Sequence, residues 1–427
     1  MTQPQALLQR LFQLQRFGIR PGLDRVELLL QHFGNPHRCY PAIHVTGTNG
    51  KGSVCALLAS ALHAQGYRVG LYTSPHLIQF NERIRVSGFP IGIGEITQIL
   101  PALLHEGERI GATFFEITTA LAYTLFAHHN IDIAVVEVGM GGRYDATNVI
   151  HPLVAIITGV DYDHQQYLGA TLEEIAWQKV GIVKRGCAVV IGEQRPYLRQ
   201  LIHQWAREAG GGPIVIPPAA PEMISSTPDL QQFLRLPSGD RVLFPLAGEH
   251  QRRNLSLVLA ARELIASDFP ISDTALADGL SNVRNWGGLR ARIEIVRPLP
   301  PFVIDVAHNP GGIAALLHTL DEHGYSGTRW HLVFGVMADK DYTSMLRLLQ
   351  PRTACLFACT PATERALPAE QLASKAQEIG FRCVQPFSTV AEAIHAAWQQ
   401  NEPTLVVGSF YLIGETLPIL DALCAAN

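Results

Sequence analysis

Short apolar runs rich in β-branched residues alternate along the chain with segments of helical spacing. An apolar run at residues 42–46 is followed by a helical pattern at 53–65 and a second apolar run at 69–73. Further apolar runs lie at residues 133–138, 154–158 and 188–191. Near-continuous apolar strands are typical of a parallel sheet that helices cover on both faces. The pattern therefore predicts an α/β fold with a mostly parallel sheet.

The alternation breaks between residues 211 and 249, where proline and glycine are frequent. A turn signal at Ser238-Gly239-Asp240 stands between two apolar runs, which predicts a hairpin. We expect a small antiparallel side sheet here, attached to the first domain. A helix is predicted next, over about residues 253–266.

A second α/β region is predicted after the proline-rich segment at residues 296–301. Strand and helix patterns alternate again from residue 302 to residue 407, which indicates a smaller Rossmann-like domain. A chain of 427 residues is also too long for one ordinary hydrophobic core. We therefore expect two domains, at residues 1–297 and 298–427.

Composition and charge narrow the class of protein. Hydrophobic residues make up 47% of the chain and charged residues 16%, which is typical of a globular protein. The net charge of −4 argues against a nucleic-acid or membrane-surface binder. The N-terminus does not resemble a secretory signal, and no run reaches the roughly 20 apolar residues of a membrane span. We expect a cytoplasmic monomer with small-molecule substrates.

The seven cysteines are scattered, without a CxxC pair or a spacing typical of disulfides. This distribution predicts free thiols in a reducing compartment. The cysteines are Cys39, Cys55, Cys187, Cys355, Cys359, Cys383 and Cys424.

Residues 46–53 form a glycine-rich segment between a predicted strand and a predicted helix. Glycines let the backbone turn tightly, so that its N–H groups can surround an anion at the positive end of the helix. Lys51 can place a cation against the β- and γ-phosphates, and Ser53 can offer a hydroxyl to Mg²⁺. We therefore predict a phosphate loop for ATP. Its candidate residues are Gly47, Thr48, Asn49, Gly50, Lys51, Gly52 and Ser53.

Three further polar residues each have a functional and a purely structural interpretation. Glu137 ends an apolar strand at the sheet edge where ligands bind, so it can hold a metal ion or pair with a basic residue. His164 follows another strand, where a lone histidine is most often an ordinary surface or core residue. Lys179 ends a predicted helix and is most simply a solvated charge. The residues alone leave these alternatives open.

The phosphate loop departs from the common spacing, because Gly52 separates Lys51 from Ser53. In this it resembles the loop of the Mur-ligase superfamily, whose members activate a carboxylate with ATP and couple it to an amine. Other segments resemble folylpolyglutamate and dihydrofolate synthases, in the family's order and over nearly the whole chain. They lie at residues 70–88, 114–123, 135–150, 163–186, 250–254, 305–312, 338–342, 365–368 and 408–415.

The resemblance implies two Mg²⁺ ions and a modified lysine. Lys51, Lys179 and His164 are the implied catalytic residues. In related enzymes the lysine that matches Lys179 is carbamylated by CO₂, which gives it a carboxylate for the second metal ion. The implied metal ligands are Ser53, Ser74 and Glu137 for the first ion, and His164 and Lys179 for the second.

The resemblance also implies nucleotide contacts from residues far apart in the sequence. Asn254 and Arg292 match positions that approach the nucleotide, and Asp305 and His308 match the contribution of the second domain. Arg290 is an alternative to Arg292, because the family's compact Trp-Pro-[Gly/Ala]-Arg-[Leu/Phe]-Glu segment is longer in this chain, at residues 286–294.

The implied activity is ATP-dependent ligation of L-glutamate to a folate, to dihydropteroate or to both, through an acyl phosphate. The sequence does not distinguish these acceptors. Two alternatives are a Mur ligase of the peptidoglycan type and a non-enzymatic nucleotide-binding protein with a phosphate loop. The first usually carries an additional N-terminal nucleotide-sugar domain, for which little room exists before residue 42.

Overall fold

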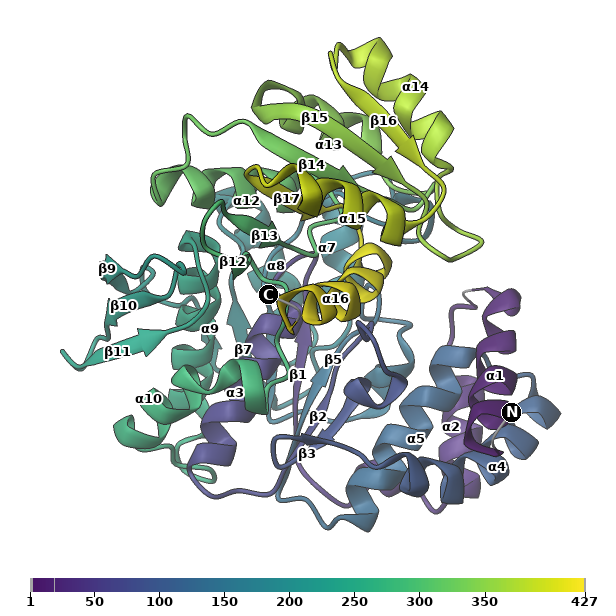
Figure 1. Cartoon of the computed structure of the whole chain (residues 1–427). Helices are drawn as coiled ribbons and strands as arrows, with labels where there is room; N and C mark the ends of the chain where they lie inside the picture. Colours follow the sequence, from purple (N-terminus) through teal and green to yellow (C-terminus); the bar gives the residue numbers. More distant parts are fainter. Residues whose placement is uncertain (1–2, 19, 426–427) are drawn as a thin grey trace. The chain divides into compact units, whose positions relative to one another are not determined.

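The computed structural model describes residues 3–18 and 20–425. The chain forms two compact units, and Figure 1 labels their helices and strands. The first unit contains Met1–Pro75, Phe80–Ala220 and Arg253–Leu289. The second contains His76–Gln79, Pro221–Arg252 and Arg290–Asn427. Each unit has its own sheet and hydrophobic core, as the two α/β patterns predict.

The first unit is built on a sheet of eight described strands in the order β4-β3-β2-β5-β1-β6-β7-β8. Strands from β2 to β8 in this order are parallel, whereas β3 and β4 add an antiparallel edge. Every residue of β1, β5, β6 and β7 is buried, which explains their continuous apolar sequences. The strands are β1 (Ala42–Thr46), β2 (Val69–Tyr72), β3 (Ile84–Val86), β4 (Phe89–Pro90), β5 (Ile133–Glu137), β6 (Val154–Ile157), β7 (Ala188–Ile191) and β8 (Ile214–Val215).

Helices cover this sheet and carry the loops that precede them. Helix α3 contacts β1, β2 and β5 as well as α10 and α11, so it is buried along most of its length. Helices α1, α2, α4 and α5 pack together in one apolar cluster. The helices are α1 (Gln3–Gln13), α2 (Asp24–His32), α3 (Lys51–Ala64), α4 (Ile93–Ile110), α5 (Phe114–His128), α6 (Gln165–Leu168), α7 (Leu172–Val180), α8 (Pro196–Glu208), α9 (Glu249–Ile265), α10 (Asp273–Ser281) and α11 (Val283–Trp286).

The second unit contains a sheet of six described strands in the order β12-β13-β17-β14-β15-β16. All neighbours are parallel except β12 and β13. The strands are β12 (Glu294–Arg297), β13 (Phe302–Ile304), β14 (Trp330–Phe334), β15 (Thr353–Cys359), β16 (Val384–Phe387) and β17 (Thr404–Val407). The helices are α12 (Pro310–Glu322), α13 (Tyr342–Leu349), α14 (Ala369–Ile379), α15 (Val390–Gln400) and α16 (Phe410–Ala425).

The antiparallel side sheet is present, with its hairpin turn where the sequence places it. Strands β9 (Glu222–Ser226), β10 (Gln232–Arg235) and β11 (Arg241–Phe244) pair in the order β11-β10-β9 (Figure 1). By its contacts this sheet groups with the second unit, although we expected it in the first domain. The reason is apolar packing, since Leu230 and Ala247 share a core cluster with Ile313. The domain boundary after residue 297 stays a prediction.

The expectation that all seven cysteines are free thiols is wrong. Cys355 and Cys383 form a disulfide, with 4.6 Å between their Cα atoms. Cys355 lies in β15 and Cys383 just precedes β16, and these strands pair in parallel. The sequence spacing of 28 residues gave no hint of this, because a strand-helix-strand unit separates two neighbours in the sheet.

Reducing this disulfide is expected to destabilise the second unit. A link between residues 28 apart lowers the conformational entropy of the unfolded chain, which raises the free energy of unfolding by about 3 to 4 kcal/mol. Thiol titration in denaturant should detect five free cysteines before reduction and the remaining two only afterwards. Cys359→Ala should still show two cysteines released by reduction, whereas finding all seven reactive without reductant would contradict the disulfide.

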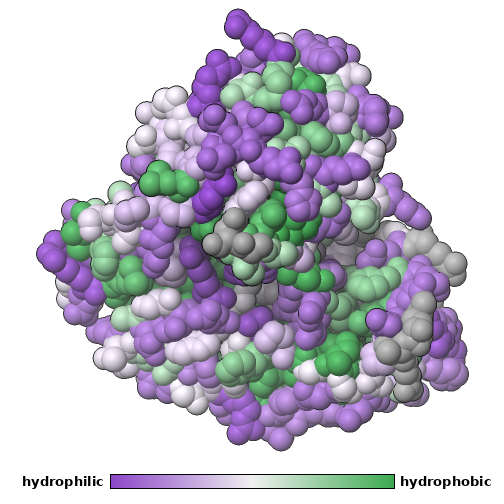
Figure 2. Space-filling model, in the orientation of Figure 1, coloured by the Kyte–Doolittle hydropathy of each residue, from purple (hydrophilic) through white to green (hydrophobic). Residues whose placement is uncertain are grey.

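The face seen in Figure 2 is mostly hydrophilic, with hydrophobic residues in patches. Among the described helices, none has the length and apolar character that crossing a membrane requires.

Candidate active site

The predicted phosphate loop connects β1 to α3, as the sequence indicates. Loop residues are tied to the segment that follows β6. Thr48 N–H donates to Gly159 O at 2.9 Å, and Thr158 Oγ1 donates to Asn49 O at 2.6 Å. Thr48 Oγ1 accepts from Asp161 N at 2.8 Å. The loop conformation is therefore fixed by the segment that follows β6.

Two glycines of the loop are required by close packing. Gly47 has φ of 154°, and a Cβ there would lie 1.8 Å from Thr158 Oγ1. Gly50 has φ of 88°, and a Cβ there would lie 2.5 Å from Asn254 Oδ1. Only glycine fits these positions. The contact at Gly50 also places Asn254 of α9 directly against the loop, although the two are 204 positions apart in the sequence.

Two lysines lie at this loop in different environments. Lys51 begins α3, and its Nζ donates to Gly47 O and Thr48 O, each at 3.1 Å. Lys179 of α7 is 2% exposed. Burial, followed by the charge of Lys51, holds the pKa of Lys179 well below its ordinary value, and Asp163 opposes this shift. The simple interpretation of Lys179 as a solvated surface charge is therefore wrong.

Glu137 lies at the carboxyl end of β5 and is 5% exposed. Its Oε2 accepts from Ser74 N at 3.0 Å, which joins two residues predicted to share a metal ion. Burial raises the pKa of the neighbouring Cys55 thiol, and the charges of Glu137 and Lys51 act on the same thiol in opposite directions. Cys55 is thus within electrostatic range of two candidate site residues. Ser53, two positions earlier on α3, is 2% exposed.

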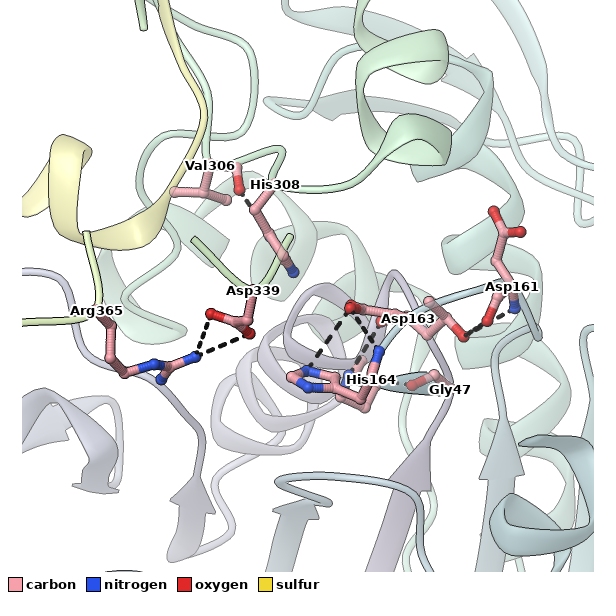
Figure 3. A network of polar contacts seen from close by, with 10 residues as sticks. Gly47, Asp161, Asp163, His164, Val306, His308, Asp339 and Arg365 are labelled. Carbon is pink, nitrogen blue, oxygen red and sulfur yellow. Dashed lines mark hydrogen bonds and ion pairs between the residues drawn. The ribbon is translucent and has the colours of Figure 1, made fainter. Parts of the chain in front are cut away.

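His164 is adjacent to Asp163 in the segment after β6 (Figure 3). Asp163 Oδ1 accepts from His164 N at 2.9 Å and lies 3.9 Å from His164 Nε2. His164 has φ of 51°, a left-handed conformation that non-glycine residues seldom adopt. Residues in such conformations cluster at functional sites.

In the second unit, Arg292 and His308 lie at one aromatic ring, and both act electrostatically on Asp305. The Arg292 guanidinium lies 5.4 Å from the Phe410 ring centroid, and the His308 ring lies 5.5 Å from it. His308 Nδ1 also contacts Val306 O at 3.0 Å (Figure 3). Burial raises the pKa of Asp305, while the charges of Arg292 and His308 lower it.

Arg290 and Arg292 have different side-chain partners, and the choice between them as the nucleotide contact stays a prediction. Arg290 Nε donates to Glu294 at 2.8 Å, so this side chain is used within its own loop. Arg292 Nη1 donates to the loop carbonyls of Arg290 and Ala291, each at 3.4 Å, and its guanidinium also lies beside Asp305 and Phe410.

The predicted metal ligands offer a mixed set of donors. Among the described residues, no group of three or more His, Cys, Asp or Glu side chains is placed to hold a metal ion. Serine hydroxyls with one carboxylate, as at Ser53, Ser74 and Glu137, still suit Mg²⁺, which commonly binds few protein carboxylates together with substrate phosphates.

The sequence interpretation missed two kinds of residue. One is Phe410, which lies in a segment that resembles the family, at residues 408–415, but carries no polar group that would mark it as a site residue. Thr158 and Asp161, which hold the phosphate loop, gave no motif signal, because their role depends on β6 lying beside β1.

Two family models match the chain: the Mur ligase middle domain at residues 45–262 and the Mur ligase glutamate ligase domain at residues 291–410. With the phosphate loop, they define the chain as a Mur-type ligase. The dihydrofolate synthase/folylpolyglutamate synthase of Bacillus subtilis is 34% identical over 422 residues, covering 94% of this chain and 95% of the relative. The chain therefore belongs to the folylpolyglutamate synthase/dihydrofolate synthase family.

Further relatives and solved structures agree with this assignment. The Escherichia coli dihydrofolate synthase/folylpolyglutamate synthase is 32% identical, covering 94% of this chain and 92% of the relative. The Mycobacterium tuberculosis folylpolyglutamate synthase complexed with ADP has a TM-score of 0.85 and 32% identity, covering 97% of this chain and 99% of that chain. E. coli FolC in complex with DHPP and ADP has a TM-score of 0.83 and 30% identity, covering 98% of each chain.

Proposed function

We propose that this protein ligates L-glutamate to a folate, to dihydropteroate or to both, using ATP. The acceptor carboxylate attacks the γ-phosphate to form an acyl phosphate and release ADP. The amine of glutamate then attacks the acyl carbon, forms the amide and releases phosphate. The observation that carries this proposal is the phosphate loop of the family, which is held against Asn254. Lys179 is within electrostatic range of Lys51 in this loop, and Glu137 pairs with Val45 in the strand that leads into it.

We propose that the first unit binds the phosphates of ATP. Backbone N–H groups at residues 47–53 and the positive end of α3 favour an anion there. Lys51 would offset the charge that builds up when an anionic carboxylate meets the triphosphate. Ser53, Ser74 and Glu137 would hold a first Mg²⁺, which supplies further charge neutralisation when it is bound.

We assign Lys179 as a carbamylated ligand of a second Mg²⁺, together with His164. A carbamate forms when the lone pair of a neutral amine attacks CO₂ and the nitrogen loses a proton. The depressed pKa of Lys179 favours that neutral amine. Carbamylation then replaces a buried amine by a carboxylate-like group, which offers oxygen ligands to a hard cation.

In the second unit, Arg292, Asp305 and His308 are assigned to the nucleotide. The domain division at residues 297 and 298, a monomeric state and substrates limited to small molecules belong to the same proposal. The second unit's match to the glutamate ligase domain supports a role for it in ligation.

Product analysis tests the proposal and identifies the acceptor. Purified protein with ATP, Mg²⁺ and L-glutamate should release ADP only when dihydropteroate or a reduced folate is added, and mass spectrometry should detect the added glutamate. Products from both acceptors would define a bifunctional enzyme. If the rate of ADP release did not change on adding any pterin acceptor or glutamate, the proposed ligase activity would be wrong. That result would favour the non-enzymatic nucleotide-binding alternative or a different Mur-type substrate.

A further inference from the structure

The loop that carries Arg292 has a backbone conformation unfavourable for its sequence. Ala291 and Ile293, on either side of Arg292, have φ of 53° and 52°. The left-handed region is costly for any residue with a Cβ, and for a β-branched residue it is an outlier. Both residues are at most 1% exposed. Such strain persists only where the surrounding structure fixes it.

Two carboxylates fix this loop through its backbone. Glu294 Oε2 accepts from Ala291 N at 2.8 Å, while Arg290 Nε donates to Glu294 Oε1 at 2.8 Å. Asp305 Oδ2 accepts from Ile293 N at 2.8 Å, and its Oδ1 accepts from Ala307 N at 2.7 Å. Each left-handed residue therefore donates its N–H to one carboxylate.

We infer that Glu294 is a positioning residue that acts through Arg292. Its carboxylate holds the left-handed turn at Ala291, and the turn directs the Arg292 side chain toward Asp305 and Phe410. Because Glu294 binds Arg290 and the backbone, it has no need to touch a substrate. The inference rests on the proposed function, in which Arg292 contacts the nucleotide.

Loss of Glu294 is expected to weaken nucleotide use more than it weakens the fold. Glu294→Ala should raise the KM for ATP about tenfold, because the turn can relax and Arg292 is no longer held in place. Glu294→Gln keeps an oxygen acceptor for Ala291 N–H and should restore most of the loss. The matched control is Glu378→Ala, which removes an exposed carboxylate paired with Lys375 on α14. It should leave KM unchanged.

A double variant separates positioning from a direct role. Glycine adopts a left-handed turn at little cost, so Ala291→Gly in the Glu294→Ala background should recover most of the roughly tenfold rise in KM. Kinetics, binding of a non-hydrolysable ATP analogue by calorimetry, and thermal melting should be measured on each full-length variant.

The outcomes distinguish this inference from the proposed function. If Glu294→Ala matches Glu378→Ala in KM and nucleotide affinity, or if glycine at position 291 recovers nothing, the positioning role is wrong. If the unsubstituted protein forms no glutamylated product, the proposed ligase fails instead, while the calorimetric comparison still reports on Glu294.

Discussion

Replacing Lys51 by alanine is expected to lower kcat by about 10²- to 10³-fold, the usual effect of removing one preorganised charge at a reacting centre. Lys51 begins α3 and contacts the carbonyls of Gly47 and Thr48, so its charge lies within the loop that would hold the phosphates. Steady-state kinetics and ATP-analogue binding should be measured together.

The fold should survive this change, because the Lys51 side chain is only partly buried. Lys375→Ala is a suitable control, since Lys375 forms an ion pair with Glu378 on α14. It should retain full activity. A Lys51→Ala protein that turns over at the rate of this control would disprove the phosphate-loop assignment.

Replacing Lys179 by alanine is expected to reduce kcat by about 10²-fold or more, because the site loses the carbamate that would bind the second metal ion. Removing CO₂ and bicarbonate from the buffer should lower the activity of the unsubstituted protein, and adding bicarbonate should restore it. NMR with ¹³C-labelled bicarbonate should show one carbamate resonance that Lys179→Ala lacks.

Chemical rescue provides the sharper test of the carbamate. Formate or acetate can enter the space left in Lys179→Ala and replace the missing carboxylate, so either should recover part of the activity. Lys184→Ala is the matched control, a half-buried lysine four residues beyond α7 that should remain active. Full activity of Lys179→Ala without added carboxylate would refute the role of the residue.

The free energy of unfolding is also expected to depend on pH, because Lys179 is buried. Without the modification, the depressed pKa of Lys179 means that the unfolded chain binds more protons than the folded chain, from that pKa up to the ordinary 10.5. The free energy of unfolding should therefore rise with pH across this window. Lys179→Met should flatten this rise, which thermal melts from about pH 6 to about pH 9 would detect.

Local sequence patterns predicted much of the fold because their elements form from neighbouring residues. The strands Ala42–Thr46 and Ala188–Ile191 match the expected bounds. Boundaries moved where capping or packing decides them. Helix α9 begins at Glu249, four residues before its predicted start, and α3 begins at Lys51 within the phosphate loop.

The residues of the candidate site could be predicted where they lie close together in a short sequence motif. The spacing of Gly47, Gly50 and Lys51 predicts a phosphate loop. In the structure, glycine is required at positions 47 and 50 because Thr158 and Asn254 leave no room for a Cβ atom. Residues such as Asn254 and Lys179 became candidates only through the family resemblance. A single asparagine or lysine has no local signal, and its neighbours depend on distant parts of the chain.

The sequence by itself determined the α/β class, the phosphate loop and the family, because periodicity and short motifs depend on residues close together in the chain. Only the tertiary structure decided what each polar group faces. It buried Lys179, joined Cys355 to Cys383, packed the side sheet with the second unit and placed Asn254 against Gly50. Burial, pairing and pKa arise from groups brought together across long stretches of sequence, which no local pattern encodes.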